Sequence, residues 1–263
     1  MSSSRRQFLQ IASASVTGAA LGTALRADIP TLGMIFPPAN YPVPPEATLL
    51  YPSGVRFLAE GVGLEKMTAE EYDRVFVRIL PAAEKLAKQG ANAISVMGTS
   101  LTFYKGAEYE HQLKAQVTKL TGLPSTTMST GIVEGLKAVN ARKVAVATAY
   151  DEDVSHRLKV FLEESGFQVV SVKGLGIVSF KDRGPVTPDE LLDFSASVYE
   201  GAPKADALVI SCGALKTLEL IVPLEQRCKA PVVSSTPHAL WASVRLLGLS
   251  GQAKGYGTVL AKG

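Results

Sequence analysis

The chain has 263 residues, which is enough for one large domain or two smaller lobes with a substantial core. Its net charge of +3 is small and its lysines and arginines are scattered, which excludes the basic surface typical of nucleic-acid-binding proteins. The sequence has no run of about eighteen or more apolar residues, so we expect no stable membrane span.

The first 27 residues differ in composition from the rest of the chain. Arg5 and Arg6 precede a Phe-Leu pair, and a weakly apolar run rich in Ala, Gly and Ser extends from residue 11 to about residue 25. This pattern resembles a twin-arginine export signal, which a receptor reads and which is removed from the mature protein. We therefore expect residues 1–27 to lie outside the folded domain and the protein to be periplasmic. The alternative is a disordered basic tail on a cytoplasmic protein.

Strands and helices are predicted to alternate along the mature chain, which is typical of parallel α/β sheets. The predicted strands are residues 31–36, 93–97, 125–128, 142–148, 167–172 and 205–210, with a last strand after Pro231. The predicted helices are residues 68–89, 106–121, 129–139, 151–165, 187–201, 222–229 and 237–248.

Local signals set several of these boundaries. A proline-rich segment, residues 42–52, is expected to be a loop without regular structure. Thr68 and Glu71 have the spacing of a capping box at the start of the first helix, and Pro81 should kink or split that helix. Thr187, which a proline follows, is typical of an N-cap and predicts another helix start.

Two segments repeat one pattern at a spacing of about 110 residues. Residues 91–101 read A-N-A-I-S-V-M-G-T-S-L, residues 205–215 read A-D-A-L-V-I-S-C-G-A-L, and Pro124 pairs with Pro231 in the same alignment. The repeat predicts an α/β fold of two pseudo-symmetric lobes, each a short parallel sheet flanked by helices. The active site is expected in the cleft between the lobes, because ligands of open α/β sheets bind beyond the carboxyl ends of strands.

The repeat divides the mature chain. Lobe 1 is expected at residues 28–140, completed by residues 236–263, and lobe 2 at residues 141–235. Hydroxyl groups, backbone N–H groups and small side chains at strand ends can bind an oxyanion or a carboxylate. The strand ends expected to face the cleft are Pro37-Pro38, Gly98-Thr99-Ser100, Tyr150, Ser211-Cys212-Gly213 and Ser234-Ser235-Thr236.

The repeat differs at one chemically important position, where Cys212 in the second copy replaces Gly98 of the first. A thiol there could be a nucleophile or a proton donor, and a nucleophile normally needs a base, for which His238 is the best-placed histidine. A disulfide between Cys212 and Cys228 is disfavoured, because the helix predicted to carry Cys228 leads away from the strand end. The cysteines and histidines lack metal-ligand spacing, so we expect no metal site.

Five segments of the mature chain, in order, carry a family resemblance. They are M-G-T-S-L-T-F-Y-K-G (97–106), T-T-M-S-T (126–130), A-T-A-Y (147–150), S-C-G-A-L (211–215) and P-V-V-S-S-T-P (231–237). Together they resemble the arylmalonate decarboxylases of the aspartate/glutamate racemase superfamily. The resemblance implies the same duplicated two-lobe fold and cofactor-free decarboxylation of a small dicarboxylate, a substituted arylmalonate.

The resemblance also implies roles for single residues. One substrate carboxylate would be held by neutral hydrogen-bond donors, namely Thr99, Ser100, Tyr150 and Gly213. The other carboxylate would leave as CO₂ from an apolar pocket, and Cys212 would then protonate the enediolate on one face. The pocket positions implied by the resemblance are Pro38, Leu64, Met67, Tyr72, Phe180, Arg183 and Ala214.

Gly98 distinguishes the chain from the racemases of this superfamily, which carry a cysteine at both repeat positions. With one thiol missing, one-sided protonation after loss of CO₂ is favoured over two-base racemisation or isomerisation. Arg183 departs from the expected apolar pocket, because it would stabilise the leaving carboxylate unless it points outward or binds a carboxylate of another substrate. An export signal is also unexpected in this family.

Two alternative functions stay open at this point. A racemase or isomerase of a small carboxylic acid could pair Cys212 with a non-cysteine partner such as Tyr150. An exported solute-binding protein for a carboxylate would suit the two lobes and the signal, but such a protein needs no thiol in its cleft.

Overall fold

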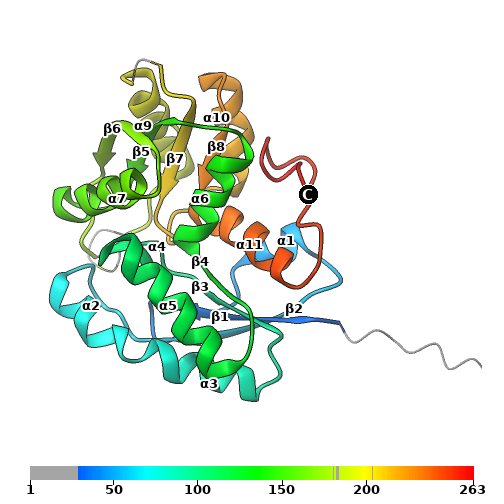
Figure 1. Ribbon diagram of the computed structural model, residues 1–263. Helices are drawn as coiled ribbons and strands as arrows, with labels where there is room; N and C mark the ends of the chain where they lie inside the picture. The colour runs from blue at the N-terminus through cyan, green and yellow to red at the C-terminus, as the bar shows by residue number, and fades with distance from the viewer. Residues whose placement is uncertain (1–28, 180, 182–183, 203) are drawn as a thin grey trace, which may run out of the picture.

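Two parallel sheets of four strands each form the framework of the protein (Figure 1). The computed structural model describes residues 29–179, 181, 184–202 and 204–263, so the export signal expected at residues 1–27 lies outside the described residues. Within that part of the chain, no helix combines the length and the apolar character that a membrane crossing requires.

The first sheet has the strand order β2-β1-β3-β4, with every neighbouring pair parallel. Its strands are β1 (Thr31–Phe36), β2 (Arg56–Gly61), β3 (Ala93–Val96) and β4 (Ser125–Thr127). The accompanying helices are α1 (Pro45–Leu50), α2 (Ala69–Phe76), α3 (Ile79–Lys88), α4 (Thr99–Phe103), α5 (Gly106–Thr121) and α6 (Met128–Ala138). All residues of β1 and β3 are buried, as apolar runs in central strands should be.

The second sheet repeats the first with the order β6-β5-β7-β8, again all parallel. Its strands are β5 (Lys143–Thr148), β6 (Gln168–Gly174), β7 (Ala207–Ser211) and β8 (Val232–Ser234). Its helices are α7 (Glu152–Glu164), α9 (Pro188–Glu200), the short 3₁₀ helix η1 (Leu218–Leu220) and α10 (Ile221–Cys228). The last helix, α11 (Ser235–Leu246), follows β8 but packs against the first sheet. The expected α/β fold of two parallel sheets flanked by helices is confirmed.

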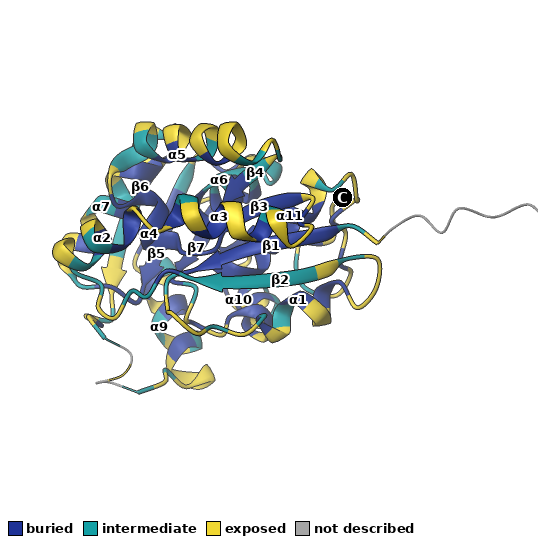
Figure 2. Ribbon diagram, turned by 90° about the horizontal axis from the view of Figure 1, so that it is seen from below, coloured by how far each residue is buried: buried dark blue, intermediate teal, exposed yellow. Residues whose placement is uncertain are grey.

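The proline-rich segment corrects one expectation, because it contains the helix α1. Pro44 is its N-cap and Pro45 its first helical residue, a position at which the missing N–H of proline costs nothing. The strand β2 was also not predicted. Figure 2 shows β2 as an edge strand of mostly intermediate burial beside the fully buried β1. Its sequence, R-F-L-A-E-G, has an apolar run of only three residues, which is too short to mark a strand.

The signals around the first predicted helix had different outcomes. Thr68 is the N-cap of α2, but its side chain makes no capping hydrogen bond, and Glu71 instead accepts from Arg74 at 2.8 Å. The capping box is therefore wrong. The predicted helix is split in two as expected, but the break lies at Val77 and Arg78, and Pro81 is the third residue of α3. The N-cap at Thr187 is confirmed as well, by a hydrogen bond from the N–H of Glu190 at 3.3 Å.

Helices α6 and α11 pack side by side where the two sheets meet (Figure 1). Each follows the edge strand of one sheet and contacts the edge strand of the other: α6 contacts β8, and α11 contacts β4. The two backbones approach closely at Gly131, where an added Cβ would lie 2.7 Å from the Cα of Ala239 and 2.9 Å from the carbonyl oxygen of His238. Only glycine permits this contact, which fixes one sheet relative to the other.

Gly131→Ala is therefore expected to lower the free energy of unfolding by about 1–3 kcal/mol, because the added methyl group forces α6 and α11 apart. Gly135→Ala is the matched control in the same helix. Its Cβ would meet only side-chain atoms, of Val233 at 3.1 Å and His238 at 3.2 Å, which can move. Urea unfolding of both variants checks the prediction, and equal stabilities would contradict it.

Candidate active site

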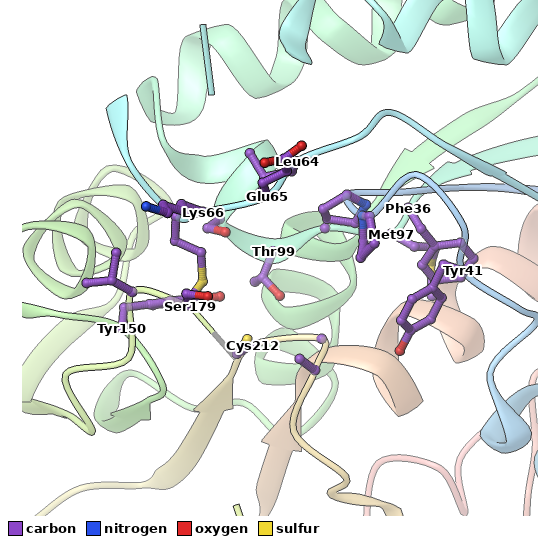
Figure 3. A pocket seen from close by; sticks show the side chains of 18 of the residues that line it. Phe36, Tyr41, Leu64, Glu65, Lys66, Met97, Thr99, Tyr150, Ser179 and Cys212 are labelled. Carbon is purple, nitrogen blue, oxygen red and sulfur yellow. The ribbon is translucent and has the colours of Figure 1, made fainter. Parts of the chain in front are cut away.

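A cavity of about 350 Å³ lies between the two lobes, beyond the carboxyl ends of their central strands (Figure 3). It is lined by residues that follow β1, β2 and β3 of one sheet and β5, β6 and β7 of the other. The expected site residues that line it are Thr99, Ser100, Tyr150, Cys212, Gly213, Pro38, Leu64, Met67 and Ala214. The structure thus brings together turns that are far apart in the sequence.

Tyr72 is not among the residues that line this cavity. It is fully buried in α2, with its ring 4.2 Å from that of Tyr104. Burial raises the pKa of Tyr72 well above its ordinary value, and the nearby Ser100 hydroxyl opposes this only partly. Tyr72 therefore lies behind the wall of the cavity. Phe180 and Arg183 lie outside the described residues, so their expected pocket role stays a prediction.

The lobe 1 turn presents the hydroxyls of Thr99 and Ser100, both buried, at the start of α4. Two side-chain hydroxyls donate hydrogen bonds to backbone carbonyls of this turn. Thr102 Oγ1 donates to the carbonyl of Gly98 at 2.9 Å, and Ser129 Oγ donates to the carbonyl of Thr99 at 3.1 Å. Both residues line the cavity, and in this structure the Thr99 hydroxyl donates to the hydroxyl of Ser235 at 2.8 Å.

The lobe 2 turn presents Cys212 directly after β7, with only 5% of the residue exposed. Its φ of 152° lies in a region that side-chain-bearing residues rarely adopt, at a cost of about 1–3 kcal/mol. Figure 3 shows the Cys212 sulfur facing the Thr99 hydroxyl across the cavity. Strained residues of this kind concentrate at active sites, where the surrounding structure enforces their conformation.

Burial raises the pKa of the Cys212 thiol to about 11, although the N–H groups of Ala214 and Leu215 and the Tyr150 hydroxyl act in the opposite direction. At pH 7 only about one molecule in 10⁴ therefore carries a thiolate. Burial, and after it the neighbouring Cys212, raise the pKa of Tyr150 well above its ordinary range. The site accordingly presents protonated, neutral donors.

His238 does not line the cavity, although it was the best-placed histidine in the sequence. It is buried in α11, where its Nδ1 accepts a hydrogen bond from the N–H of Ser234 at 2.9 Å. Burial lowers the pKa of His238 to about 4, so its ring is neutral at pH 7. Cys212 and Cys228 are both free thiols, as expected.

The apolar side of the cavity contains residues that the sequence did not reveal, namely Phe36, Tyr41, Met97 and Val178. Phe36 and Tyr41 stack with their ring centroids 4.6 Å apart. Phe36 and Met97 end predicted strands, so the rule that ligands bind beyond the carboxyl ends of strands could have found them. That rule does not find Tyr41 or Val178. Tyr41 lies next to the proline-rich segment, and Val178 follows an edge strand. The N–H of Met67 donates to the carbonyl of Val178 at 3.0 Å, which joins the two lobes across the cavity.

Among the described residues, the charged groups that line the cavity come from the loops after β2 and β6. Glu65 and Lys66 follow β2, and Lys181 lies in the segment after β6. Within residues 29–179, 181, 184–202 and 204–263, no group of three or more His, Cys, Asp or Glu side chains is arranged to hold a metal ion.

Comparison with known proteins gives one consistent family. The family model for arylmalonate decarboxylase matches residues 32–260. An arylmalonate decarboxylase from Bordetella bronchiseptica is 43% identical over 233 residues, which cover 88% of this chain and 97% of that protein. A maleate isomerase from Nocardia farcinica is 28% identical over 130 residues, which cover 49% of this chain and 51% of the isomerase.

Solved structures agree with the sequence comparison. A liganded double mutant of arylmalonate decarboxylase superposes with a TM-score of 0.84 at 42% identity, over 88% of this chain and 98% of that chain. A maleate isomerase from Pseudomonas putida S16 superposes with a TM-score of 0.80 at 21% identity, over 88% and 98% of the two chains. The second likeness is one of fold.

The raised pKa of Cys212 predicts how the thiol reacts with alkylating agents. Because only the thiolate reacts, alkylation of Cys212 by iodoacetamide should still be accelerating at pH 10, with a midpoint near its pKa of about 11. Mass spectrometry of the Cys212 peptide, in a Cys228→Ser background, measures the rate over a pH series. A rate that has already levelled off by pH 10 would show that the thiol is an ordinary or activated one, because an unperturbed cysteine has a pKa of about 8.5.

Proposed function

The chain belongs to the arylmalonate decarboxylase family and is a carboxy-lyase, and from this premise we propose that it releases CO₂ from an aryl-substituted malonate without a cofactor, with Cys212 as the proton donor. The observation that most supports the proposal is a protonated thiol facing neutral hydroxyl donors across a largely apolar cavity.

The carboxylate that stays on the substrate is held by the hydroxyls of Thr99, Ser100 and Tyr150 and by the N–H of Gly213. When the other carboxylate leaves, the retained one becomes an enediolate and its oxygens gain charge. Donors already aimed at those oxygens stabilise the charged state more than the ground state, which is the usual source of catalysis at such sites. These neutral donors supply the stabilisation that a cofactor or Lewis acid would otherwise give.

The leaving carboxylate lies against apolar side chains, among them Leu64, Met67 and Val178. A charged carboxylate loses solvation free energy among these side chains, whereas neutral CO₂ does not. The bond between the α-carbon and this carboxylate breaks, and its electron pair stays on the substrate as the enediolate.

Cys212 then transfers the proton of its S–H group to the α-carbon, and the thiolate that is formed regains a proton from water. An enediolate carbon is a much stronger base than a thiolate, so transfer from a thiol with a pKa of about 11 is still downhill. Gly98 occupies the equivalent position of the other lobe and offers no proton. Protonation therefore occurs from one side, which argues against the racemase or isomerase alternative.

Replacing the thiol tests the proposal directly. Cys212→Ser should reduce CO₂ release from phenylmalonate by about 100-fold or more, the usual contribution of a positioned proton donor. Cys228→Ser removes the other free thiol and should leave the rate unchanged. Release of CO₂ is measured with purified mature protein in buffer containing EDTA, in which the wild-type rate should not fall.

The alternatives give different results in the same assays. Deuterium incorporation into an unreacted chiral monocarboxylic acid, without CO₂ release, would indicate a racemase or isomerase. Thermal stabilisation by many diacids without turnover would indicate a solute-binding protein. Either result, or a Cys212→Ser variant with undiminished activity, would contradict the proposed function.

We also propose that residues 1–27 direct export through the twin-arginine route. Replacing Arg5 and Arg6 together by lysine keeps the charge of the segment but removes the arginine pair. The double variant should stay in the cytoplasm, whereas wild type should reach the periplasm with a shortened N-terminus. Cell fractionation and intact mass measure both, and identical distributions of the two proteins would favour the basic-tail interpretation.

A further inference from the structure

The hydroxyl of Ser235 lies between the two turns that form the site. Ser235 is the first residue of α11 and only 1% of it is exposed. Its Oγ accepts a hydrogen bond from the backbone N–H of Cys212 at 3.0 Å and lies 2.8 Å from the Oγ1 of Thr99. One buried hydroxyl therefore joins the turn that carries the thiol to the turn that carries a carboxylate donor in the other lobe.

The hydrogen-bonding capacity of Ser235 limits what it can do. A serine hydroxyl has one hydrogen to donate and two lone pairs to accept with. The N–H of Cys212 occupies one lone pair, and the only other acceptor found near the Ser235 hydrogen in the described part of the chain is the carbonyl of Ile210, at a long 3.5 Å. The hydrogen of Ser235 is therefore available to the oxygen of Thr99.

This pairing can reverse when a ligand binds. In this structure the Thr99 hydroxyl donates to Ser235. When a carboxylate enters, Thr99 can turn its hydrogen onto that carboxylate and accept the hydrogen of Ser235 instead. Thr99 is then polarised by the bond that it accepts, which makes it a stronger donor to the enediolate.

The internal repeat shows that the hydroxyl of Ser235, which follows β8, has no counterpart at the equivalent position after β4. Pairing Pro124 with Pro231 places Met128 opposite Ser235, and the sulfur of Met128 also lies near the Thr99 hydroxyl, at 2.9 Å. A thioether can accept a hydrogen bond but has no hydrogen to donate. The next residues, Ser129 and Thr236, are equivalent in role, since each donates to a backbone carbonyl of its neighbouring turn, at 3.1 Å and 3.3 Å.

We propose that Ser235 is a positioning residue for the decarboxylation. Its hydroxyl orients Thr99 toward the retained carboxylate and holds the backbone of Cys212 in its unusual conformation, so that donor and thiol converge on one substrate. The proposal rests on the proposed function and adds a residue that acts through two others. Ser235 does not itself line the cavity.

Two alanine variants test it. Ser235→Ala should lower kcat/KM for phenylmalonate by about 10-fold to 100-fold, the range expected when reacting groups are displaced slightly. Ser234→Ala is the matched control: the residue is equally buried, and its hydroxyl has no hydrogen-bond partner among the described residues. Its activity should stay within about twofold of wild type, because no bond is lost. Equal activities of the two variants, at comparable melting temperatures, would overturn the proposal.

A double-mutant cycle separates positioning from a merely structural role. Since Ser235 acts partly through Thr99, the loss of kcat/KM caused by Ser235→Ala should shrink in a Thr99→Val background, whereas multiplicative losses would overturn the coupling.

A binding experiment tests Ser235 separately from the proposed function, which fails if wild type releases no CO₂. Phenylacetate, which offers one carboxylate, should bind about tenfold more weakly to Ser235→Ala than to Ser234→Ala, and equal affinities would refute the role.

Discussion

The backbone contact between α6 and α11 is the constraint on which the site depends. Each helix begins where an edge strand ends, so its first residues lie at the same edge of the molecule as the turns that carry Thr99 and Cys212. Because Gly131 lets the two helices touch, the strand ends of one sheet are held opposite those of the other. The first turns of these helices then support the two turns that line the cavity, through Ser129, Ser235 and Thr236.

Burial favours the neutral form of each of the three titratable side chains Cys212, Tyr150 and His238. It raises the pKa values of Cys212 and Tyr150 and lowers that of His238, so all three are neutral at pH 7. At the centre of the cavity a dianionic substrate would thus meet neutral dipoles, while the charged Glu65, Lys66 and Lys181 line it from the loops. In such a poorly solvated space, a hydrogen bond to a developing negative charge is stronger than the same bond in water.

The parts of the molecule that could be predicted from sequence are those fixed by local pattern or by the repeat. β1 was predicted with its observed bounds, because a strand buried on both faces has an unbroken apolar run. Thr99 and Cys212 were found because both follow such strands. The helix α1 was missed because prolines were taken to exclude a helix, although proline is compatible with the first turn of one. The strand β2 was missed because a partly exposed edge strand has only a weak hydrophobic pattern.

What the sequence could not reveal depends on which elements meet in three dimensions. Ser235 was visible as a strand end, but its two partners are known only once α11 is seen to pack against the first sheet. Tyr41 enters the cavity from a segment without periodicity. His238 was placed near the cleft by its position in the chain, yet its ring is turned to the backbone of its own helix start.

The buried, protonated state of Cys212 has a further consequence, for redox chemistry. The thiolate, not the thiol, is the nucleophile that attacks disulfides and oxidants, so a thiol that is hardly ionised at neutral pH reacts slowly with both. Sulfenic acid formation and mixed disulfides are suppressed by the same desolvation that keeps the proton on sulfur. An enzyme that uses such a thiol as an acid needs no reducing compartment to keep it intact.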